Sequence, residues 1–237
     1  MISIIIPLYN SQKTISQTLE SILAQNYTKY EVIIVNDGSR DASLEIINSG
    51  QEKFWSRKIR YKIINQENHG APHARNQGYQ ASRGNYLLFC DADIILDRDC
   101  LRIMRDTLEN NPQASYAYSS FRWGRKLFKL FPFDKEKLKK MPYIHSTSLI
   151  RKSDFPQCGW DAQIKKLQDW DLWLAFLSET KIGIFIDRVL FQVQTGGTMS
   201  SWLPSFAYKL FPFLPQVRKY NEARKIILKK YSNLSDN

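Results

Sequence analysis

The sequence predicts an α/β protein built on a doubly wound, mostly parallel sheet. Continuous apolar runs alternate with helix-like stretches through the first 96 residues, and such runs are typical of strands buried on both faces. Right-handed crossovers bring the carboxyl ends of these strands to one edge, which is where open α/β sheets bind ligands. The four runs are Ile2 to Ile6, Glu31 to Asn36, Ile59 to Ile64 and Tyr86 to Cys90.

Each run is followed by a polar loop and then by a helical pattern. The first run stops at Pro7, and Ile15 and Leu19 share one face of the helix after it. The second run ends in Asp37, and another helical stretch follows. The third run is followed by a polar loop over 65–71 and a short helix over 75–81. Strands and helices therefore alternate as the fold class requires.

Composition is that of an ordinary globular protein, with 43% hydrophobic and 24% charged residues among 237. We expect a single domain over 1–200, with a nucleotide-binding half at 1–96 and a second half at 97–200. No apolar stretch approaches the roughly 18 residues that span a bilayer, and no signal peptide is visible, so we expect a cytoplasmic location. Cys90, Cys100 and Cys158 have neither zinc spacing nor a disulfide framework and are expected to be reduced and mostly buried thiols.

The formal charge of +11 favours anionic partners, namely nucleotides, nucleic acid or acidic lipids. Basic and aromatic residues concentrate at 122–140 and in a basic aromatic tail at 201–237, where an amphipathic helix is expected over 216–231. Lys-Leu-Phe-Pro-Phe occurs twice, at 129–133 and 209–213. Such a pattern suits a peripheral position at the inner, anionic face of a membrane. Packing of the aromatic rings onto the domain explains it equally well.

Two carboxylates, Asp91 and Asp93, follow directly after the fourth strand. Strand alternation would place both on one side, where they could bind one hard cation that also bridges phosphate oxygens. A capping role for Asp91 is the alternative. Asp37 ends the second strand and could accept a hydrogen bond from a uracil-like imide, with Tyr9 stacking on the base. Gly-x-Gly-x-x-Gly and Walker loops are absent, which argues against dinucleotide dehydrogenases and P-loop enzymes.

Taken together, these motifs resemble the family 2 glycosyltransferases of GT-A fold. The resemblance rests on the order and spacing of several segments and covers residues 1 to about 200. The segments are Ile5-Ile6-Pro7-Leu8-Tyr9-Asn10, Val35-Asn36-Asp37-Gly38-Ser39-Arg40-Asp41, Asn68-His69-Gly70, Ala74-Arg75-Asn76-Gln77-Gly78, Asp91-Ala92-Asp93 and Gln168-Asp169-Trp170-Asp171-Leu172-Trp173-Leu174.

The resemblance implies a set of site residues. Asp91 and Asp93 would bind a divalent cation, Mn or Mg, on the donor diphosphate, and Asp169 would be the catalytic base. In-line attack by a deprotonated acceptor hydroxyl would invert the anomeric centre. The donor-binding residues would be Pro7, Tyr9, Asn10, Asp37, Arg75, Asp91, Ala92 and Asp93.

Two features of the segment at 168–171 bear on the assignment of the base. The family often has Glu-Asp where this chain has Gln168-Asp169, so the role of the first position is open. Asp171 competes with Asp169, because on a helix the two side chains point about 200° apart and only one can face the donor. The Gln-x-x-Arg-Trp signature of processive synthases is absent, which favours transfer of a single sugar.

The second half is expected to recognise the acceptor. Residues 116–121 and 143–150 are predicted strands, and the latter carries His145 and Ser146 as candidate acceptor contacts, although a structural role for His145 is the more common one. Trp170, beside the expected base, is a third candidate. A Gly-containing loop at 195–200 could close over the donor, or be only a connection.

We therefore expect a hexosyltransferase-type enzyme of cell-surface polysaccharide or glycan biosynthesis. It would transfer a sugar from a nucleotide donor, which we expect to be a UDP-sugar, to a hydroxyl of a lipid-linked or saccharide acceptor, without a nucleic-acid partner. The alternatives are a nucleotidyltransferase, which would need a phosphate-gripping basic loop that 8–11 does not provide, and a non-catalytic membrane or anion-binding protein.

Overall fold

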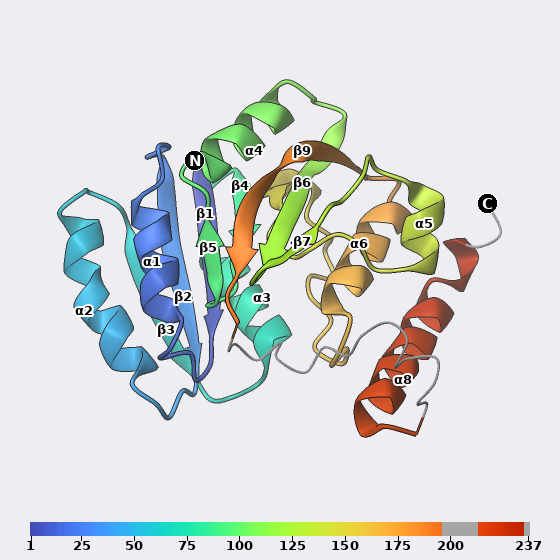
Figure 1. Ribbon diagram of the computed structural model, residues 1–237, viewed down its shortest axis with the longest axis horizontal. Helices are drawn as coiled ribbons and strands as arrows, with labels where there is room; N and C mark the ends of the chain where they lie inside the picture. The colour runs from blue at the N-terminus through green and yellow to red at the C-terminus, as the bar shows by residue number, and fades with distance from the viewer. Residues whose placement is uncertain (196–212, 235–237) are drawn as a thin grey trace.

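A single curled sheet organises the computed structural model, which describes residues 1–195 and 213–234 (Figure 1). Within these residues the strand order is β3-β2-β1-β4-β8-β6-β9-β5, and β7 pairs with β6. The strands are β1 (Ile2–Leu8), β2 (Tyr30–Asp37), β3 (Tyr61–Gln66), β4 (Tyr86–Phe89), β5 (Ile94–Leu96), β6 (Ala114–Trp123), β7 (Lys126–Phe128), β8 (Leu149–Arg151) and β9 (Ile182–Val193). The helices are α1 (Ile15–Leu23), α2 (Ser43–Trp55), α3 (Ala71–Ala81), α4 (Cys100–Glu109), α5 (Lys135–Lys140), α6 (Gln168–Ser178) and α8 (Pro215–Lys230).

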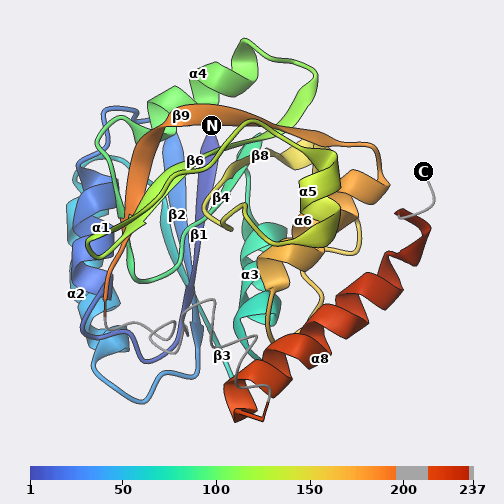
Figure 2. The same cartoon turned by 45° about the vertical axis from the view of Figure 1, so that its right-hand side comes forward.

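The first half is the parallel part that the sequence predicts. β3, β2, β1 and β4 run parallel, and α3 covers the face of the sheet opposite to α1 and α2 (Figure 2). Strand alternation divides β2 between the two faces: Ile33 and Val35 pack with Ala74 of α3, whereas Val32 and Ile34 belong to the main core. Because the strands are parallel, the loops after β1, β2 and β4 meet at one edge.

The second half adds antiparallel pairs and curls the sheet. β8 is antiparallel to both β4 and β6, β9 is parallel to β6, and β5 is antiparallel to β9. β5 thereby returns over α1, where Thr18 Oγ1 donates to Ala92 O at 3.0 Å and Ser21 Oγ accepts from Leu96 N at 3.1 Å. The sheet is therefore mostly rather than wholly parallel.

Several element boundaries differ from those predicted, and three of them lie close to the ends of segments that carry candidate site residues. β1 continues through Pro7 to Leu8, and α3 begins at Ala71 rather than at residue 75. The predicted strand over 143–150 shortens to β8, because local hydrogen bonds turn the chain before it: Thr147 N donates to His145 Nδ1 at 3.0 Å and Ser148 N donates to Ser146 O at 2.8 Å.

A buried carboxylate fixes the opposite, amino-terminal edge of the parallel strands. Glu31 is fully buried and accepts hydrogen bonds at 2.6 Å from Ser3 Oγ and from Arg83 N, and Arg60 pairs with its other oxygen. Burial alone would raise the pKa of Glu31, but these hydrogen bonds and the Arg60 charge outweigh it and lower the pKa. Glu31 therefore contributes stability as an anion.

The C-terminal helix α8 lies against the second half of the domain. Val217, Ala223 and Ile227 are its buried residues, and Ile227 joins the main core. The first Lys-Leu-Phe-Pro-Phe copy also packs inward, since Leu130 is buried and Phe131 and Phe133 lie against the core. Most of the second copy, and residues 196–200 of the expected closing loop, lie outside the described residues.

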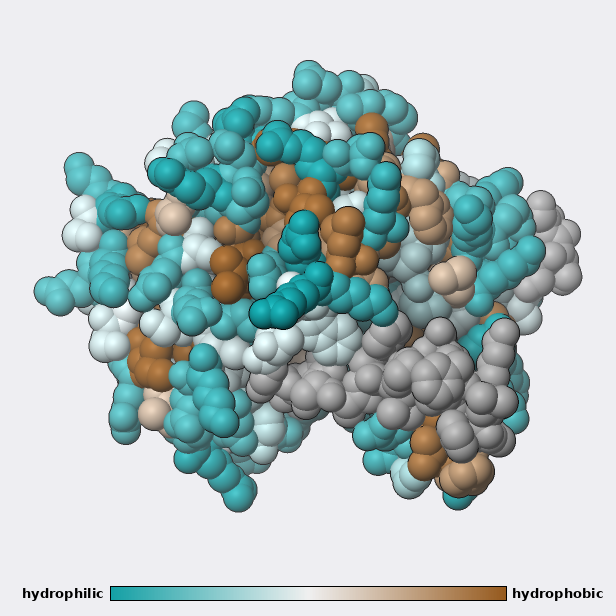
Figure 3. Space-filling view, in the orientation of Figure 1, coloured by the Kyte–Doolittle hydropathy of each residue, from teal (hydrophilic) through white to brown (hydrophobic). Residues whose placement is uncertain are grey.

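Hydrophobic side chains interrupt the mainly hydrophilic surface over the central strands and near the lower end of α8 (Figure 3). Among the described residues, none of the helices is both long enough and apolar enough to cross a bilayer.

Candidate functional site

The loops after β1 and β2 are tied to each other at the carboxyl edge of the sheet. Asn10, in a left-handed conformation with φ of 47°, accepts from Arg40 N at 2.8 Å through its side chain and donates from its backbone to Ser39 Oγ at 3.1 Å. Tyr9 stays 41% exposed, so its ring has a face available for stacking. Pro7 is half-buried in β1, just before this loop.

Asp37 organises the loop that leads into α3. Its Oδ1 accepts from Gln66 Nε2 at 2.7 Å and from His69 N at 2.8 Å, and its Oδ2 accepts from Gly70 N at 2.8 Å. The residue is only 2% exposed. This loop-ordering role was not predicted, and it involves all three residues of Asn68-His69-Gly70, because Asn68 Nδ2 also donates to Asp37 O at 3.0 Å.

Arg75 on α3 joins the two halves of the protein. Its Nη2 pairs with Asp91 Oδ1 at 2.7 Å, its Nη1 donates to Gln168 Oε1 at 2.9 Å, and its guanidinium lies 4.5 Å from the centre of the Trp160 ring. Nε is buried and has no hydrogen-bond partner within the described residues. Gln168 thus has a clear role here, which is to accept a hydrogen bond from Arg75.

Trp160 is a site residue that the sequence did not reveal. Trp160 is 2% exposed. The Asn76 side chain bonds both of its backbone groups: Oδ1 accepts from Trp160 N at 2.9 Å, and Nδ2 donates to Trp160 O at 2.8 Å. Gly159, with φ of 61°, provides the turn before it. In the sequence, the feature that could have pointed to Trp160 is its partner Asn76, which directly follows Arg75 in a motif that resembles the family.

Asp91 and Asp93 lie close enough to influence each other. They belong to a turn, closed by Ile94 N donating to Asp91 O at 3.1 Å, so strand alternation is not what places them. Burial alone would raise the pKa of Asp91, but the charges of Arg75 and His145 and hydrogen bonds lower it. Burial and then the Asp91 charge raise the pKa of Asp93 to about 7. Asp93 is 8% exposed.

This pair suits a hard divalent cation. Both ligands are carboxylate oxygens, and Asp93 has no ion-pair partner within the described residues, so a cation would relieve the repulsion between them. Among the described residues, no group of three or more His, Cys, Asp or Glu side chains is arranged so that it could hold a metal ion by itself. The remaining coordination positions would fall to phosphate oxygens and water. Ala92, between the two, is buried, and its backbone oxygen accepts from Thr18 Oγ1.

His145 and Ser146 lie beside these carboxylates. His145 Nδ1 accepts from Thr147 N at 3.0 Å, which places the proton of a neutral ring on Nε2. Burial lowers the pKa of His145, and the nearby charges of Asp169 and Asp91 oppose that change. Ser146 is 3% exposed and lowers the pKa of Asp91 by a hydrogen bond.

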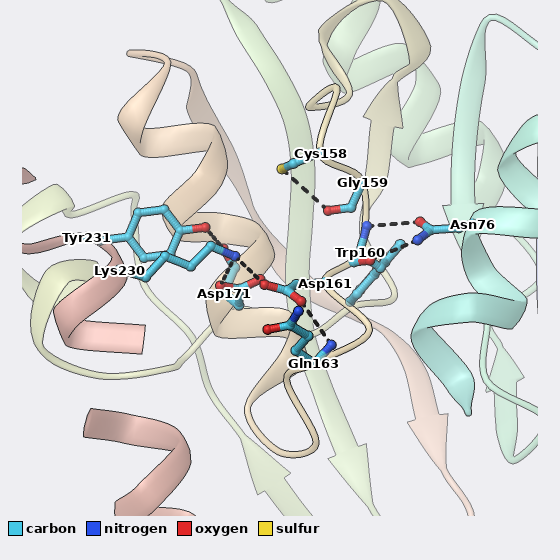
Figure 4. A network of polar contacts seen from close by, with 9 residues as sticks. All are labelled: Asn76, Cys158, Gly159, Trp160, Asp161, Gln163, Asp171, Lys230 and Tyr231. Atoms are coloured by element: carbon cyan, nitrogen blue, oxygen red, sulfur yellow. Dashed lines mark hydrogen bonds and ion pairs between the residues drawn. The ribbon is translucent and has the colours of Figure 1, made fainter. Parts of the chain in front are cut away.

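The first turn of α6 sends its side chains in three directions. Asp169 is half-buried and close enough to His145 to affect its pKa. Trp170 is fully buried and donates to Leu138 O at 2.6 Å, so its ring has no surface for an acceptor. Asp171 is 3% exposed and pairs with Lys230 Nζ at 2.9 Å (Figure 4). Of the two candidate bases, Asp169 is the one whose charge acts on His145, and Asp171 is the one paired with Lys230.

Comparison with solved structures identifies the fold first. Over 98% of this chain and 72% of the other, the fold matches residues 1–349 of TarS from S. aureus in complex with UDP-GlcNAc, with a TM-score of 0.70 and 20% identity. It also matches the mannosyltransferase PcManGT of Pyrobaculum calidifontis in complex with GDP-Man and Mn2+, over 99% and 68% of the two chains, with a TM-score of 0.69 and 16% identity. The fold is that of the GT-A glycosyltransferases.

A sequence model of "Glycosyl transferase family 2" matches residues 3–160, and the chain therefore belongs to this family. The glycosyltransferase EpsJ of Bacillus subtilis is 36% identical over 47% of this chain and 31% of its own length. The poly(ribitol-phosphate) beta-glucosyltransferase of Bacillus spizizenii is 38% identical over 42% and 16%. The chain spans about a third or less of these relatives. The resemblance seen in the motifs is confirmed.

Proposed function

We propose that this chain carries a metal-dependent, inverting glycosyltransferase that moves a single sugar from a nucleotide donor to an acceptor hydroxyl. The observation that carries the proposal is the Arg75 bridge, which joins Asp91 in the donor half to Gln168, the neighbour of Asp169. Carboxylates for donor and acceptor chemistry thus share one site. Membership of the family and the nucleotide-sugar complexes of the structural neighbours support the same activity.

For the donor we favour a UDP-sugar. Tyr9 would stack on the base, and Asp37, together with the loop that it orders, would meet the base edge and ribose. Arg75 would hold Asp91 in place, and Asp91 and Asp93 would bind Mn or Mg. That cation, when bound, would stabilise the negative charge that develops on the departing diphosphate.

Asp169 is the base in this proposal. Its carboxylate would take the proton of the acceptor hydroxyl, whose oxygen forms a bond to the anomeric carbon from the face opposite the diphosphate. The bond from that carbon to the diphosphate breaks, and its electron pair leaves with the diphosphate, which inverts the anomeric centre. Asp171 is a poorer candidate because its carboxylate is paired with Lys230.

The acceptor side offers a cleft between α8 and residues 163–166. Its volume is about 410 Å³, and it begins only a few residues before Asp169. A mixed lining suits an acceptor with both apolar and anionic parts, such as a lipid-linked saccharide. The lining includes Ile164, Ile226, Lys165, Lys166, Lys219 and the single acid Glu222.

A peripheral membrane position fits this acceptor. The first three turns of α8 expose four cations, and Phe213 and Ile226 beside them are 69% and 55% exposed. Exposed apolar groups among cations are the pattern of interfacial helices. The cations are Arg218, Lys219, Arg224 and Lys225. Sedimentation with phosphatidylglycerol vesicles should retain the protein, and equal retention by phosphatidylcholine vesicles would count against the proposal.

Calorimetric titration of UDP tests the donor site. Binding should require Mn and should be lost in Asp93→Asn, with Asp187→Asn, on the exposed part of β9, as the control. Failure of UDP to bind with or without Mn, together with salt-sensitive binding of unrelated polyanions, would support an anion-binding protein instead.

A further inference from the structure

The last turn of α8 is joined to the start of α6 by one shared cation. Lys230 Nζ lies 2.8 Å from Asp161 Oδ2 and 2.9 Å from Asp171 Oδ1 (Figure 4). Tyr231, the next residue, donates from its hydroxyl to the backbone oxygen of Asp171 at 3.1 Å. Two consecutive residues therefore hold both the side chain and the backbone of Asp171. We call Lys230, Tyr231, Asp161 and Asp171 the α8 clamp.

The clamp closes the segment from 161 to 171 at both ends. Asp161 is at the beginning of this segment, where its other oxygen accepts from Gln163 N at 2.9 Å, and Asp171 is in the first turn of α6. The donor half holds the same segment from the other side, through the Asn76 contacts to Trp160 and the hydrogen bond from Arg75 to Gln168. The segment that carries Asp169 is thus fixed between the donor half and α8.

A strained residue within this segment explains why such fastening is needed. Leu167 precedes α6 with φ of 61° and ψ of 33°, a left-handed conformation that is unfavourable for a non-glycine residue. Such conformations persist only where the surrounding structure determines them. Leu167 is directly followed by Gln168 and Asp169, so relaxation there would move both side chains.

The electrostatics favour a charged Lys230, whereas burial raises the pKa of its partner Asp171. Burial alone would lower the pKa of Lys230, but its two carboxylate partners outweigh burial and raise it. The Lys230 side chain is 32% exposed, whereas that of Asp171 is only 4% exposed. The carboxylate of Asp171 thus depends on Lys230 for its partner, while Lys230 keeps access to water.

We propose that Lys230 is a positioning residue for transfer, holding the first turn of α6 so that Asp169 faces the acceptor hydroxyl. Asp169 and Asp171 lie on opposite sides of this turn. The clamp therefore holds the side that carries Asp171, and the proposed base lies on the other side. This inference rests on the proposed function, and it assigns to α8 a part in catalysis beyond any contact with acceptor or membrane.

The test compares Lys230→Met with Lys230→Arg and with Lys229→Met, the exposed neighbour in the same helix. Lys230→Met should lower kcat about 10-fold to 100-fold while UDP affinity stays within about twofold, since misplacement of a group by about 1 Å has effects of this size. Lys230→Arg should recover most of the loss, and Lys229→Met should match the unmodified protein. Unchanged kcat in Lys230→Met, or equal losses of kcat and UDP affinity, would overturn the proposal.

Amide hydrogen exchange provides a readout independent of transfer. Residues 161–171 should exchange faster in Lys230→Met than in Lys229→Met, and unchanged exchange there would overturn the clamp whatever the activity. If Lys230→Met does not fold, Tyr231→Phe keeps the ring and removes one hydrogen bond, and it should show a smaller change in the same direction. A protein that shows the exchange difference but transfers no sugar in any form would refute the proposed function and leave the clamp in place.

Discussion

Arg75 Nη1 donates to Gln168 Oε1 at 2.9 Å, across 93 residues of chain. This contact connects α3, which follows the loops after β1 and β2, to the first residue of α6. Since Arg75 also pairs with Asp91, one side chain contacts both a proposed cation ligand and the residue next to the proposed base. The relative arrangement of the two halves is therefore set by hydrogen bonds as well as by the shared sheet.

The Gln168 contact predicts a difference between two substitutions. Gln168→Leu leaves a buried donor of Arg75 unpaired, which costs about 1–3 kcal/mol, so transfer should fall at least about 10-fold. Gln168→Glu restores an acceptor and should stay within about threefold of the unmodified protein. Steady-state kinetics with a saturating donor would measure both, and equal loss in the two variants would contradict this role.

Because α3 lies close to β1, we expect that replacing Gly78 by a larger residue lowers the stability of the protein. A Cβ at this position would collide with Cγ2 of Ile5, a fully buried residue, so α3 and Arg75 would have to shift. Gly78→Ala should destabilise the protein by about 1–3 kcal/mol and weaken UDP binding. Gly50→Ala, inside α2 with its nearest neighbour at 3.4 Å, is the control and should be neutral or stabilise by up to about 1 kcal/mol. Urea denaturation would show the difference, and equal effects would contradict it.

Glu31→Gln should lower the free energy of unfolding by about 2–3 kcal/mol at pH 7, because it removes a buried charge that has three partners. The folded-state pKa of Glu31 is lowered, so its contribution is present above the unfolded pKa of about 4.3 and is lost as pH falls through the folded pKa. The difference between the two proteins should therefore shrink below about pH 4. Thermal unfolding across pH would measure it, with exposed Glu20→Gln as the control. A difference that persists at acidic pH would contradict the charge argument.

Apolar periodicity and motif order were sufficient to predict the parallel half, because both are local properties of the chain. They could not predict β5 or β9, whose places depend on pairing between distant segments. Trp160 and Lys230 were missed for a related reason: each gains its role from partners such as Asn76 and Asp171 that are far away in sequence. Trp170 was a candidate from its place beside Asp169, but helix periodicity turns it into the core.

The choice between Asp169 and Asp171 shows what a structure adds to a motif. The sequence left both open, since helical geometry states only that they diverge. Asp171 is paired with Lys230, whereas Asp169 lies close to His145. For this reason we propose Asp169 as the base. The metal, the sugar and the acceptor remain proposals that the carboxylate pair and the α8 cleft support.

The most direct test of the central claim is transfer of sugar from UDP-sugars by the unmodified protein, Asp169→Asn and Asp171→Asn, with UDP affinity measured for each. We predict that Asp169→Asn binds UDP normally but loses transfer by about 1,000-fold or more, while Asp171→Asn retains measurable transfer. Transfer that survives in Asp169→Asn, or UDP binding that is lost with it, would contradict the assignment of Asp169 as the base.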